Sequence, residues 1–214
     1  MNPEHARLCA SPEWAEVIQT EVLPLLCRDA DLGSVMLEVG PGPGAATGWL
    51  SRRVTTLVAV EADQAAADAL AAAYAGTNVD VIAGDARTLP FEDGHFDSAG
   101  AFTMLHHIPT AAGQNALLAE ILRVLRPGGA LIASDSLPSD GLHHFHEADT
   151  YNPVEPETLL TRLATLGFAD MTIRVGRGLT FVAHKPSEDS EAPSGPAPAG
   201  TAVPAGPVPA GPTA

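Results

Sequence analysis

A glycine-rich turn, GPGPG, constrains the fold of this chain more than any other feature. It follows the apolar run 34–39, which is bounded by Gly33 and Gly40 and is typical of a strand buried on both faces. A segment with helical spacing comes next. Glycines at positions 40, 42 and 44 let the backbone approach a ligand closely, and a helix N-terminus offers free N–H groups. A strand, a tight turn and a helix in this order predict a nucleotide-like cofactor site.

Strand and helix patterns alternate along the chain. Short apolar runs predict strands at 34–39, 54–60, 79–84, 96–102, 130–136, 171–175 and 179–184. Helices are expected from Ser11-Pro12-Glu13, after the glycine turn, and at 63–75, 114–125 and 157–168. Only residues 176–178 separate the last two strands, which predicts a hairpin. The alternation predicts an α/β fold: a Rossmann-like, seven-stranded, mostly parallel sheet with one antiparallel edge strand, in three α/β/α layers.

The last residues differ in composition from the rest. Residues 186–214 contain no aromatic, Lys or Arg residue and are rich in Pro, Ala, Gly and Ser. Such a segment buries too little apolar surface to offset the entropy of ordering it. We therefore expect one folded domain over residues 1–185 and a disordered tail over residues 186–214.

The charge of the chain limits its partners. The formal net charge is −15, and removing the tail, which holds three acidic residues and no basic one, changes it only to −12. Lys185 is the sole lysine, so no basic stripe is available to contact nucleic acid phosphates. No run approaches the roughly 20 apolar residues that span a membrane, and no signal region is evident. These features predict a cytoplasmic protein that binds neither nucleic acid nor a membrane. Its expected form is a monomer or homodimer.

The glycine turn alone leaves two cofactor classes open. Gly40, Gly42 and Ala45 fit the dinucleotide fingerprint G-x-G-x-x-G/A, and Glu61 follows about 20 residues later, as that fingerprint requires. A nicotinamide-dependent oxidoreductase is therefore one interpretation of the turn. Other segments of the sequence are needed to distinguish an oxidoreductase from other classes of cofactor-binding enzyme.

Five segments together resemble one family. They are LEVGPGPG, AVEAD, AGDARTLPF, FDSAGAFTMLHHI and EILRVLRPGGALI. In this order and spacing, over residues 34–136, they resemble the small-molecule branch of the class I S-adenosylmethionine-dependent methyltransferases. The resemblance implies S-adenosyl-L-methionine as cofactor and favours a methyltransferase over an oxidoreductase.

The resemblance also implies a role for each cofactor-site residue. Glu61 would accept hydrogen bonds from the ribose hydroxyls, Asp85 would accept one from the adenine amine, and the Ala86 N–H would donate to the ring. Taken alone, Glu61 is equally interpreted as a helix-capping acid and Asp85 as a turn residue. The implied cofactor site comprises Glu38, Gly40, Gly42, Gly44, Glu61, Asp85, Ala86 and Phe102, with the glycines around the amino acid end and Phe102 or Thr103 near the sulfur.

Five of the eight histidines follow the fourth or fifth predicted strand: His106, His107, His143, His144 and His146. Carboxyl ends of parallel strands are where ligands bind, so these histidines are expected near one crevice. The LHHI pair is common in the resembled family, where it shapes the pocket. A metal set drawn from His143, His144, His146, Glu147, Asp149 and Asp135 is an alternative, but no ligand spacing supports it. We expect no metal.

The remaining histidines predict general-base catalysis. A hydroxyl is a poor nucleophile until a side chain titrating near neutrality accepts its proton. We predict His144 as this base, with His146 as the second candidate and Glu147, Asp149 or Asp135 fixing the ring tautomer. The insert DSLPSDGLHHFHEADTYNP faintly resembles sugar O-methyltransferases of actinobacterial polysaccharide pathways. O-methylation of a small polar acceptor such as a sugar is therefore expected; N- or C-methylation, and a regulatory role without catalysis, are the alternatives.

Overall fold

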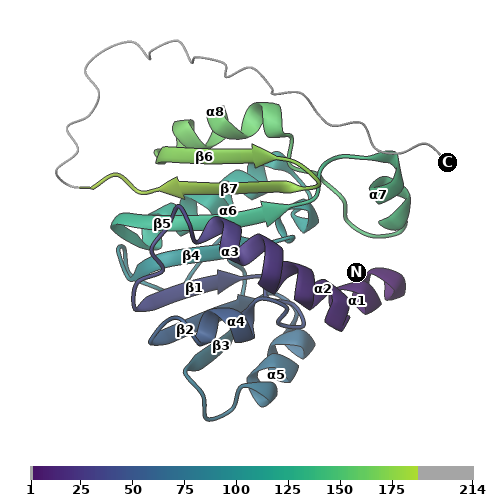
Figure 1. Ribbon diagram of the computed structural model, residues 1–214, viewed down its shortest axis with the longest axis horizontal. Coiled ribbons are helices and arrows are strands. Elements are labelled where there is room, and N and C mark those ends of the chain that lie inside the picture. Colours follow the sequence, from purple (N-terminus) through teal and green to yellow (C-terminus); the bar gives the residue numbers. More distant parts are fainter. Residues whose placement is uncertain (1, 188–214) are drawn as a thin grey trace.

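The computed structural model describes residues 2–187 and shows a central sheet with helices on both faces (Figure 1). The described range includes residues 2–185 of the folded domain that the sequence predicts. The disordered tail predicted from residue 186 onward lies, apart from its first two residues, outside the described residues. Within the described range no helix is long and apolar enough to cross a membrane.

The seven predicted strands are all present in one sheet. They are β1 (Val35–Val39), β2 (Thr56–Glu61), β3 (Val79–Ala83), β4 (Phe96–Phe102), β5 (Leu125–Asp135), β6 (Ala169–Val175) and β7 (Leu179–His184). Their order is β3-β2-β1-β4-β5-β7-β6. Strand β7 runs antiparallel to both β5 and β6. The antiparallel strand thus lies one position in from the edge, because the short turn at 176–178 folds β7 back between β5 and the edge strand β6.

Helices cover both faces of the sheet. One face carries α2 (Pro12–Val17), a π-helical turn η1 (Ile18–Val22), α3 (Leu23–Leu26), α4 (Thr47–Ser51) and α5 (Gln64–Ala73), whereas α6 (Ala111–Val124) and α8 (Pro156–Leu166) cover the other. Side-chain oxygens of Ser11, Asp63 and Thr110 cap α2, α5 and α6 by accepting backbone N–H bonds. Gly167 ends α8 in the left-handed conformation, so this helix stops shortly before residue 168, the end predicted from the sequence.

The alternation of side chains along each strand divides the core into two clusters. On β1, Met36 packs with the α2–α5 side, whereas Leu37 and Val39 pack with α6 and α8. All three are fully buried, and burying such a side chain stabilises a fold by about 1.5–3 kcal/mol. This two-sided burial explains why the strand sequences are nearly continuous apolar runs.

Two short segments meet at the carboxyl edge of the parallel strands. Helix α1 (Pro3–Cys9) precedes α2, and α7 (Asp140–Phe145) follows β5 (Figure 1). The Asn2 side chain donates a hydrogen bond to the Phe145 carbonyl at 2.8 Å, and the Asn2 backbone donates to Asp149 Oδ2 at 3.1 Å. These contacts bring the start of the described chain and the segment after β5, which are far apart in the sequence, to the edge where ligands bind in such sheets.

Candidate functional site

A cavity of about 780 Å³ lies at the carboxyl edge of the sheet. Seven of the eight predicted cofactor residues line it: Glu38, Gly40, Gly42, Glu61, Asp85, Ala86 and Phe102. The eighth, Gly44, does not line it but packs against α5, since a Cβ there would lie 2.8 Å from Leu70 Cδ1. The structure therefore brings most of the predicted cofactor residues together around one space.

The glycine turn leaves that space open. Gly40, Gly42 and Gly44 all adopt positive φ angles, at 63°, 53° and 88°, a region that side chains disfavour. A Cβ at Gly42 would meet no atom within 4 Å and would project into unfilled space. The Gly42 N–H donates to Glu61 Oε2 at 2.9 Å, so the turn is tied to the end of β2.

Two carboxyl groups lie beneath and beside the turn. Glu38 is buried at the end of β1 and accepts a hydrogen bond from Thr47 Oγ1 at 2.8 Å. Burial, opposed by that bond and reinforced by nearby Glu61, raises the pKa of the Glu38 carboxyl to about 7. Glu61 is also held by the Asp63 N–H, which donates to Oε1 at 3.0 Å. Both acceptors are thus fixed in place before any ligand binds.

Asp85 lies on the cavity wall in a more open position. Arg87 Nη2 donates to Asp85 Oδ2 at 2.6 Å, and the side chains of both residues are 46% exposed. The hydrogen bond from the Arg87 guanidinium lowers the pKa of the Asp85 carboxyl. Asp85 therefore stays ionised at neutral pH and can accept a hydrogen bond from a ligand amine.

The rest of the lining is largely apolar. The N-terminal helices contribute Ala6, Cys9, Ala10, Trp14 and Ile18, while β4 and the following turn contribute Phe102, Thr103, Met104, His107 and Ile108. Thr103 has a φ of 51°, an uncommon conformation for a residue with a side chain. A molecule beside the cofactor would therefore contact mainly hydrocarbon.

His107 is the histidine that lines this cavity. Burial, together with the neighbouring rings of His106 and His5, lowers the pKa of His107 to about 3. The ring is therefore neutral at physiological pH and is a weak proton acceptor. It suits the positioning of an acceptor better than the removal of a proton from an alcohol.

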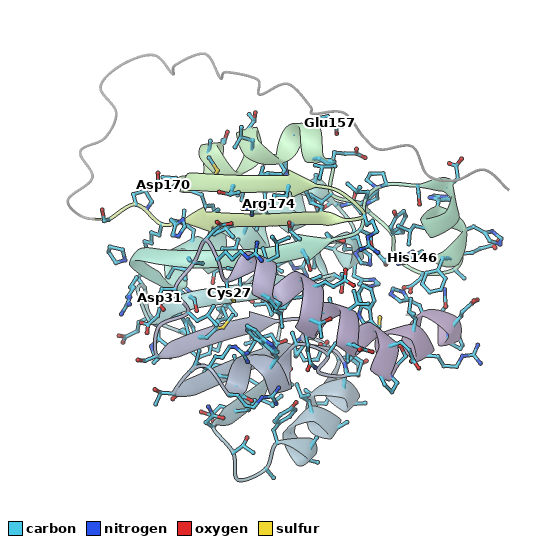
Figure 2. The ribbon with its side chains drawn as sticks, viewed as in Figure 1. Cys27, Asp31, His146, Glu157, Asp170 and Arg174 are labelled. Carbon is cyan, nitrogen blue, oxygen red and sulfur yellow. The ribbon has the colours of Figure 1, made fainter. Side chains whose placement is uncertain are left out.

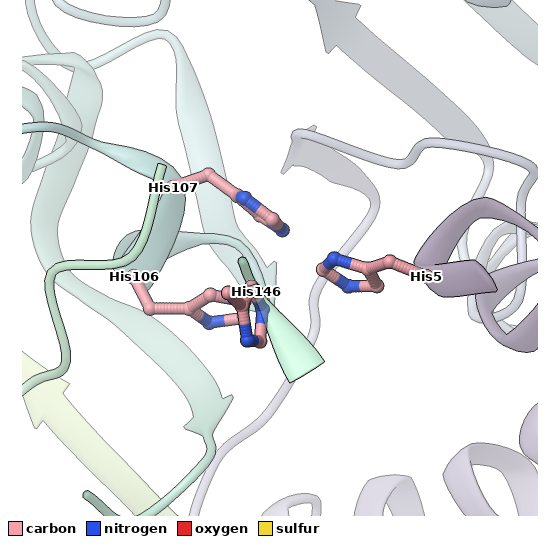
Figure 3. Close-up of side chains that lie close together, drawn as sticks. All are labelled: His5, His106, His107 and His146. Atoms are coloured by element: carbon pink, nitrogen blue, oxygen red, sulfur yellow. The ribbon is translucent and has the colours of Figure 1, made fainter. Parts of the chain in front are cut away.

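Four histidine rings, including that of His107, form a cluster at this wall of the cavity. His106 and His107 come from the 3-10 turn η2 (Leu105–His107), His5 from α1, and His146 from the residue that caps α7. One ring nitrogen of each lies within 4.8 Å of the others. Figure 3 shows the rings turned toward one another, with His5 approaching from the N-terminal helix. We call these four residues the histidine cluster.

The predicted base, His144, lies elsewhere. Its side chain is 86% exposed on α7, and its Nδ1 is 3.6 Å from Glu147 Oε2. It lines a second hollow of about 460 Å³, together with His143, His146 and Glu147, and is absent from the lining of the cofactor cavity. The reason is that α7 is one short turn of helix whose two histidines point to solvent. The catalytic role of His144 stays a prediction that this geometry does not support.

His146, the second candidate, is turned inward. It is buried, and it lies at the carboxyl edge of the sheet beside α7 (Figure 2). The alternative metal set from the sequence shares only His146 with the histidine cluster. Asp135 and Asp149, which are expected from the sequence to fix the ring tautomer of the base, contact His106 and His5 instead, and Glu147 lies beside His144.

Sequence reasoning missed His5. Asn2 caps α1 by accepting hydrogen bonds from the N–H groups of Glu4 and His5, with Pro3 at the first position. This Asn-Pro-Glu pattern has the same form as the Ser11-Pro12-Glu13 pattern that predicts α2. Applied at the N-terminus, the same signal predicts α1, although nothing in it indicates that His5 meets His106.

Comparisons with known proteins agree with this geometry. Residues 37–133 match the family model for the methyltransferase domain. The chain is 36% identical over 162 residues to an uncharacterized 37.1 kDa protein in transposon TN4556 of Streptomyces fradiae, covering 72% of this chain and 43% of that protein. It is 28% identical over 125 residues to a fatty-acid O-methyltransferase of Mycolicibacterium smegmatis, covering 58% of this chain and 44% of the relative. The chain thus spans less than half the length of these relatives.

A solved structure shares the fold. A SAM-dependent methyltransferase from Aquifex aeolicus superposes with a TM-score of 0.66 at 17% identity, covering 86% of this chain and 98% of that one. At this level of identity the likeness concerns the fold. The sheet order, the glycine turn and the matched segment all point to the same architecture.

Proposed function

We propose that the chain is a class I S-adenosylmethionine-dependent methyltransferase and that it transfers the methyl group of this cofactor to an oxygen atom of a small molecule. The observation that carries the proposal is the cavity of about 780 Å³, on which the glycine turn, Glu61, Asp85 and His107 converge. A dinucleotide-dependent oxidoreductase is not favoured, because the matched segment is that of a methyltransferase domain.

The chain's own residues fit the cofactor. The open space at Gly42 accepts the amino acid end, where a side chain would fill it. Glu61 lies at the end of β2 with its carboxylate already oriented, and Asp85 is an ionised acceptor farther along the wall. The cofactor supplies an electrophilic methyl group on a sulfonium, which the acidic residues around the cavity favour electrostatically.

The acceptor that fits this cavity has an apolar body. The wall formed by α1, α2 and η2 is mainly hydrocarbon, and burying apolar ligand surface against it contributes about 25 cal/mol per Å². His144, which the sequence predicts as the base for a sugar hydroxyl, lines the second hollow instead, together with His143 and Glu147. The fatty-acid O-methyltransferase among the relatives has a name consistent with an apolar acceptor.

The weak basicity of His107 also limits which functional group of the acceptor can receive the methyl group. An alcohol needs a general base, but the pKa of His107 is lowered to about 3. A carboxylate or an acidic phenol loses its proton without help, and its oxygen can attack the methyl group directly. We therefore propose a carboxylic acid or acidic hydroxyl on an apolar body as the acceptor, with sugar hydroxyls as the competing class.

Binding and transfer assays test the proposal in two steps. Isothermal titration is expected to show S-adenosylhomocysteine binding and no NAD(P) binding; the reverse would end the methyltransferase assignment. Labelled cofactor is then offered with fatty acids, phenols, quinols and sugars. Transfer to the first two classes supports the proposed acceptor, whereas transfer only to sugars or to a quinol carbon would refute it.

The His144→Ala variant separates the two oxygen mechanisms. If the acceptor ionises by itself, turnover stays within about twofold of the wild type. If His144 is the base for a hydroxyl, as the sequence predicts, turnover falls by roughly 100-fold to 10,000-fold while S-adenosylhomocysteine affinity is unchanged. The geometry favours the first outcome, because the His144 side chain is 86% exposed.

A further inference from the structure

We propose that His5, His106, His107 and His146 form a binding site for one divalent transition-metal cation of the zinc type. The proposal does not depend on the identity of the methyl acceptor or on the cofactor. It rests on the positions of four imidazole rings and on the groups that hold them. Imidazole nitrogen is a preferred ligand of zinc and its neighbours in the first transition row.

The four rings are close enough to share a cation. One nitrogen of each lies within 4.8 Å of the others, and neighbouring ring centroids are 4.2–5.0 Å apart for the His106–His107, His5–His146, His5–His107 and His106–His146 pairs. Nitrogens around a tetrahedral zinc ion lie about 3.4 Å apart. Binding therefore requires the widest separation to shorten by about 1–2 Å, which small rotations of the rings and of α1 supply.

The outer nitrogen of three rings is already occupied. His106 Nδ1 is 2.5 Å from Asp135 Oδ1, His146 Nδ1 is 2.7 Å from the Leu142 carbonyl, and His5 Nδ1 is 3.3 Å from Asp149 Oδ2. An acceptor beside Nδ1 keeps the proton on that nitrogen and leaves the Nε2 lone pair free. Metal-bound histidines are held by carboxylates and backbone carbonyls in this same way.

The Nε2 atoms of two of these rings are buried without a hydrogen-bond partner among the described residues. His106 and His146 are 2% and 3% exposed, and the Nε2 atom of each has no hydrogen-bond partner among residues 2–187. A buried polar atom without a partner costs about 1–3 kcal/mol. A cation between the rings would satisfy both atoms. The stacked Tyr151 ring, 4.4 Å from His146, holds that imidazole in its inward orientation.

The charges around the cluster suit a dication. The Asp135 and Asp149 side chains are 0% and 7% exposed. Two buried carboxylates beside two of the rings would balance a charge of +2.

Four protein ligands would make this a closed site. Closed zinc sites with no position for water stabilise structure, whereas catalytic ones keep a position open. The ligands come from residues 5, 106, 107 and 146, so the cation would join α1, η2 and the segment after α7. Since Ala6 and Cys9 of α1 line the cofactor cavity, we infer that the metal holds this wall of the cavity in place.

Direct metal binding tests the proposal on the full chain. Protein dialysed against a chelator is titrated with ZnCl₂ by calorimetry and with CoCl₂ by visible absorption, which reports tetrahedral coordination. We expect one ion per chain and a rise in melting temperature of at least about 5 °C with zinc. His5→Ala and His146→Ala are each expected to weaken zinc binding at least tenfold and to remove the cobalt spectrum. His143→Ala, from the same segment but exposed, is the matched control and should bind as the wild type does.

The following results would contradict the proposed metal site. Failure of the wild type to bind zinc or cobalt stoichiometrically excludes it. Binding that survives His5→Ala and His146→Ala, or that is lost in His143→Ala, places the ion elsewhere. Circular dichroism checks folding, and if His146→Ala does not fold, His5→Ala decides, because His5 lies on α1 outside the sheet. S-adenosylhomocysteine binding is measured in parallel. Its absence would contradict the proposed function but not the metal site.

Discussion

The cofactor cavity and the histidine cluster share His107, yet the chain builds them in different ways. The cofactor part of the cavity depends on backbone: the glycine turn at residues 40–44 and the ends of the parallel strands β1, β2, β3 and β4. The cluster depends on side chains from residues 5, 106, 107 and 146. A site formed by short backbone segments can be recognised from sequence motifs. A site formed by side chains that are distant in the sequence cannot.

This difference predicts that each site can be damaged without the other. Variants of the turn should alter cofactor affinity and leave zinc binding unchanged. Variants of the residues that hold the histidine rings should do the reverse. A variant of either kind that impairs both sites equally would show that they form one cooperative unit.

Gly42→Val gives the largest expected effect. The valine side chain would occupy the open space at the turn, so S-adenosylhomocysteine affinity is expected to fall at least 100-fold by calorimetry, with zinc binding retained. Gly76→Val is the matched control, because Gly76 also has a positive φ, 75°, and open space around it but does not line the cavity. Both variants carry a similar backbone strain of about 1–2 kcal/mol. Equal loss of binding in both would mean that strain, not lost ligand space, is responsible.

Glu38→Gln tests the electrostatics of the cavity floor. The pKa of Glu38 is raised to about 7 in the fold, so the folded protein binds this proton more tightly than the unfolded chain does. Stability should therefore fall as the pH rises from about 4.5 to about 7, by up to roughly 3 kcal/mol. Glutamine is uncharged and can still accept the Thr47 bond.

Urea unfolding of both proteins without cofactor, at pH 5 and pH 8, measures this effect. We expect Glu38→Gln to lose less stability than the wild type across this range. The remaining pH dependence, which other groups cause, cancels in the difference between the two proteins. A difference that does not change with pH would contradict the raised pKa of Glu38.

The sequence was sufficient for the fold, and it named most of the residues that the structure brings together around one cavity. Strand β4 begins and ends at Phe96 and Phe102 as predicted, because buried parallel strands are marked by apolar runs between turn residues. The helix predicted at 114–125 in fact begins at Ala111, since the Thr110 cap precedes a stretch with weak apolar periodicity. Gly44 has a positive φ like the other glycines of the turn, but it packs against Leu70 of α5 and does not line the cavity. The sequence of the turn alone does not show this contact.

The histidines could not be assigned from sequence alone. The order His143, His144, His146 gives no indication that α7 exposes the first two and buries the third. That difference arises because His146 contacts the rings of Tyr151 and His5, and His5 belongs to α1, far from His146 in the sequence. Local patterns specify the elements of this fold, but they do not specify which side chains meet between them.

Asp135→Asn tests the cluster from its outer side. The asparagine side chain would keep the shape of the aspartate but lose the charge that orients His106, so zinc affinity is expected to fall by about 10-fold to 100-fold. S-adenosylhomocysteine affinity should not change, because Asp135 does not line the cofactor cavity. Competition with a zinc chelator of known affinity measures the loss. Unaltered zinc affinity would show that the Asp135 contact does not support a ligand.

Asp85→Ala is expected to have the smallest effect and compares two acceptors within the cofactor cavity. Glu61 accepts two backbone N–H bonds, so Glu61→Ala both removes a ligand contact and frees the turn, and it should weaken S-adenosylhomocysteine binding by about 1–3 kcal/mol. Asp85 is half exposed and paired with Arg87, so water replaces much of what its loss removes. We expect a loss of about threefold to tenfold for Asp85→Ala, and a smaller one for Arg87→Ala, which leaves the acceptor in place. If Asp85→Ala weakens binding as much as Glu61→Ala does, exposure does not govern the strength of these contacts, and the adenine end of the cavity must close over the ligand when it binds.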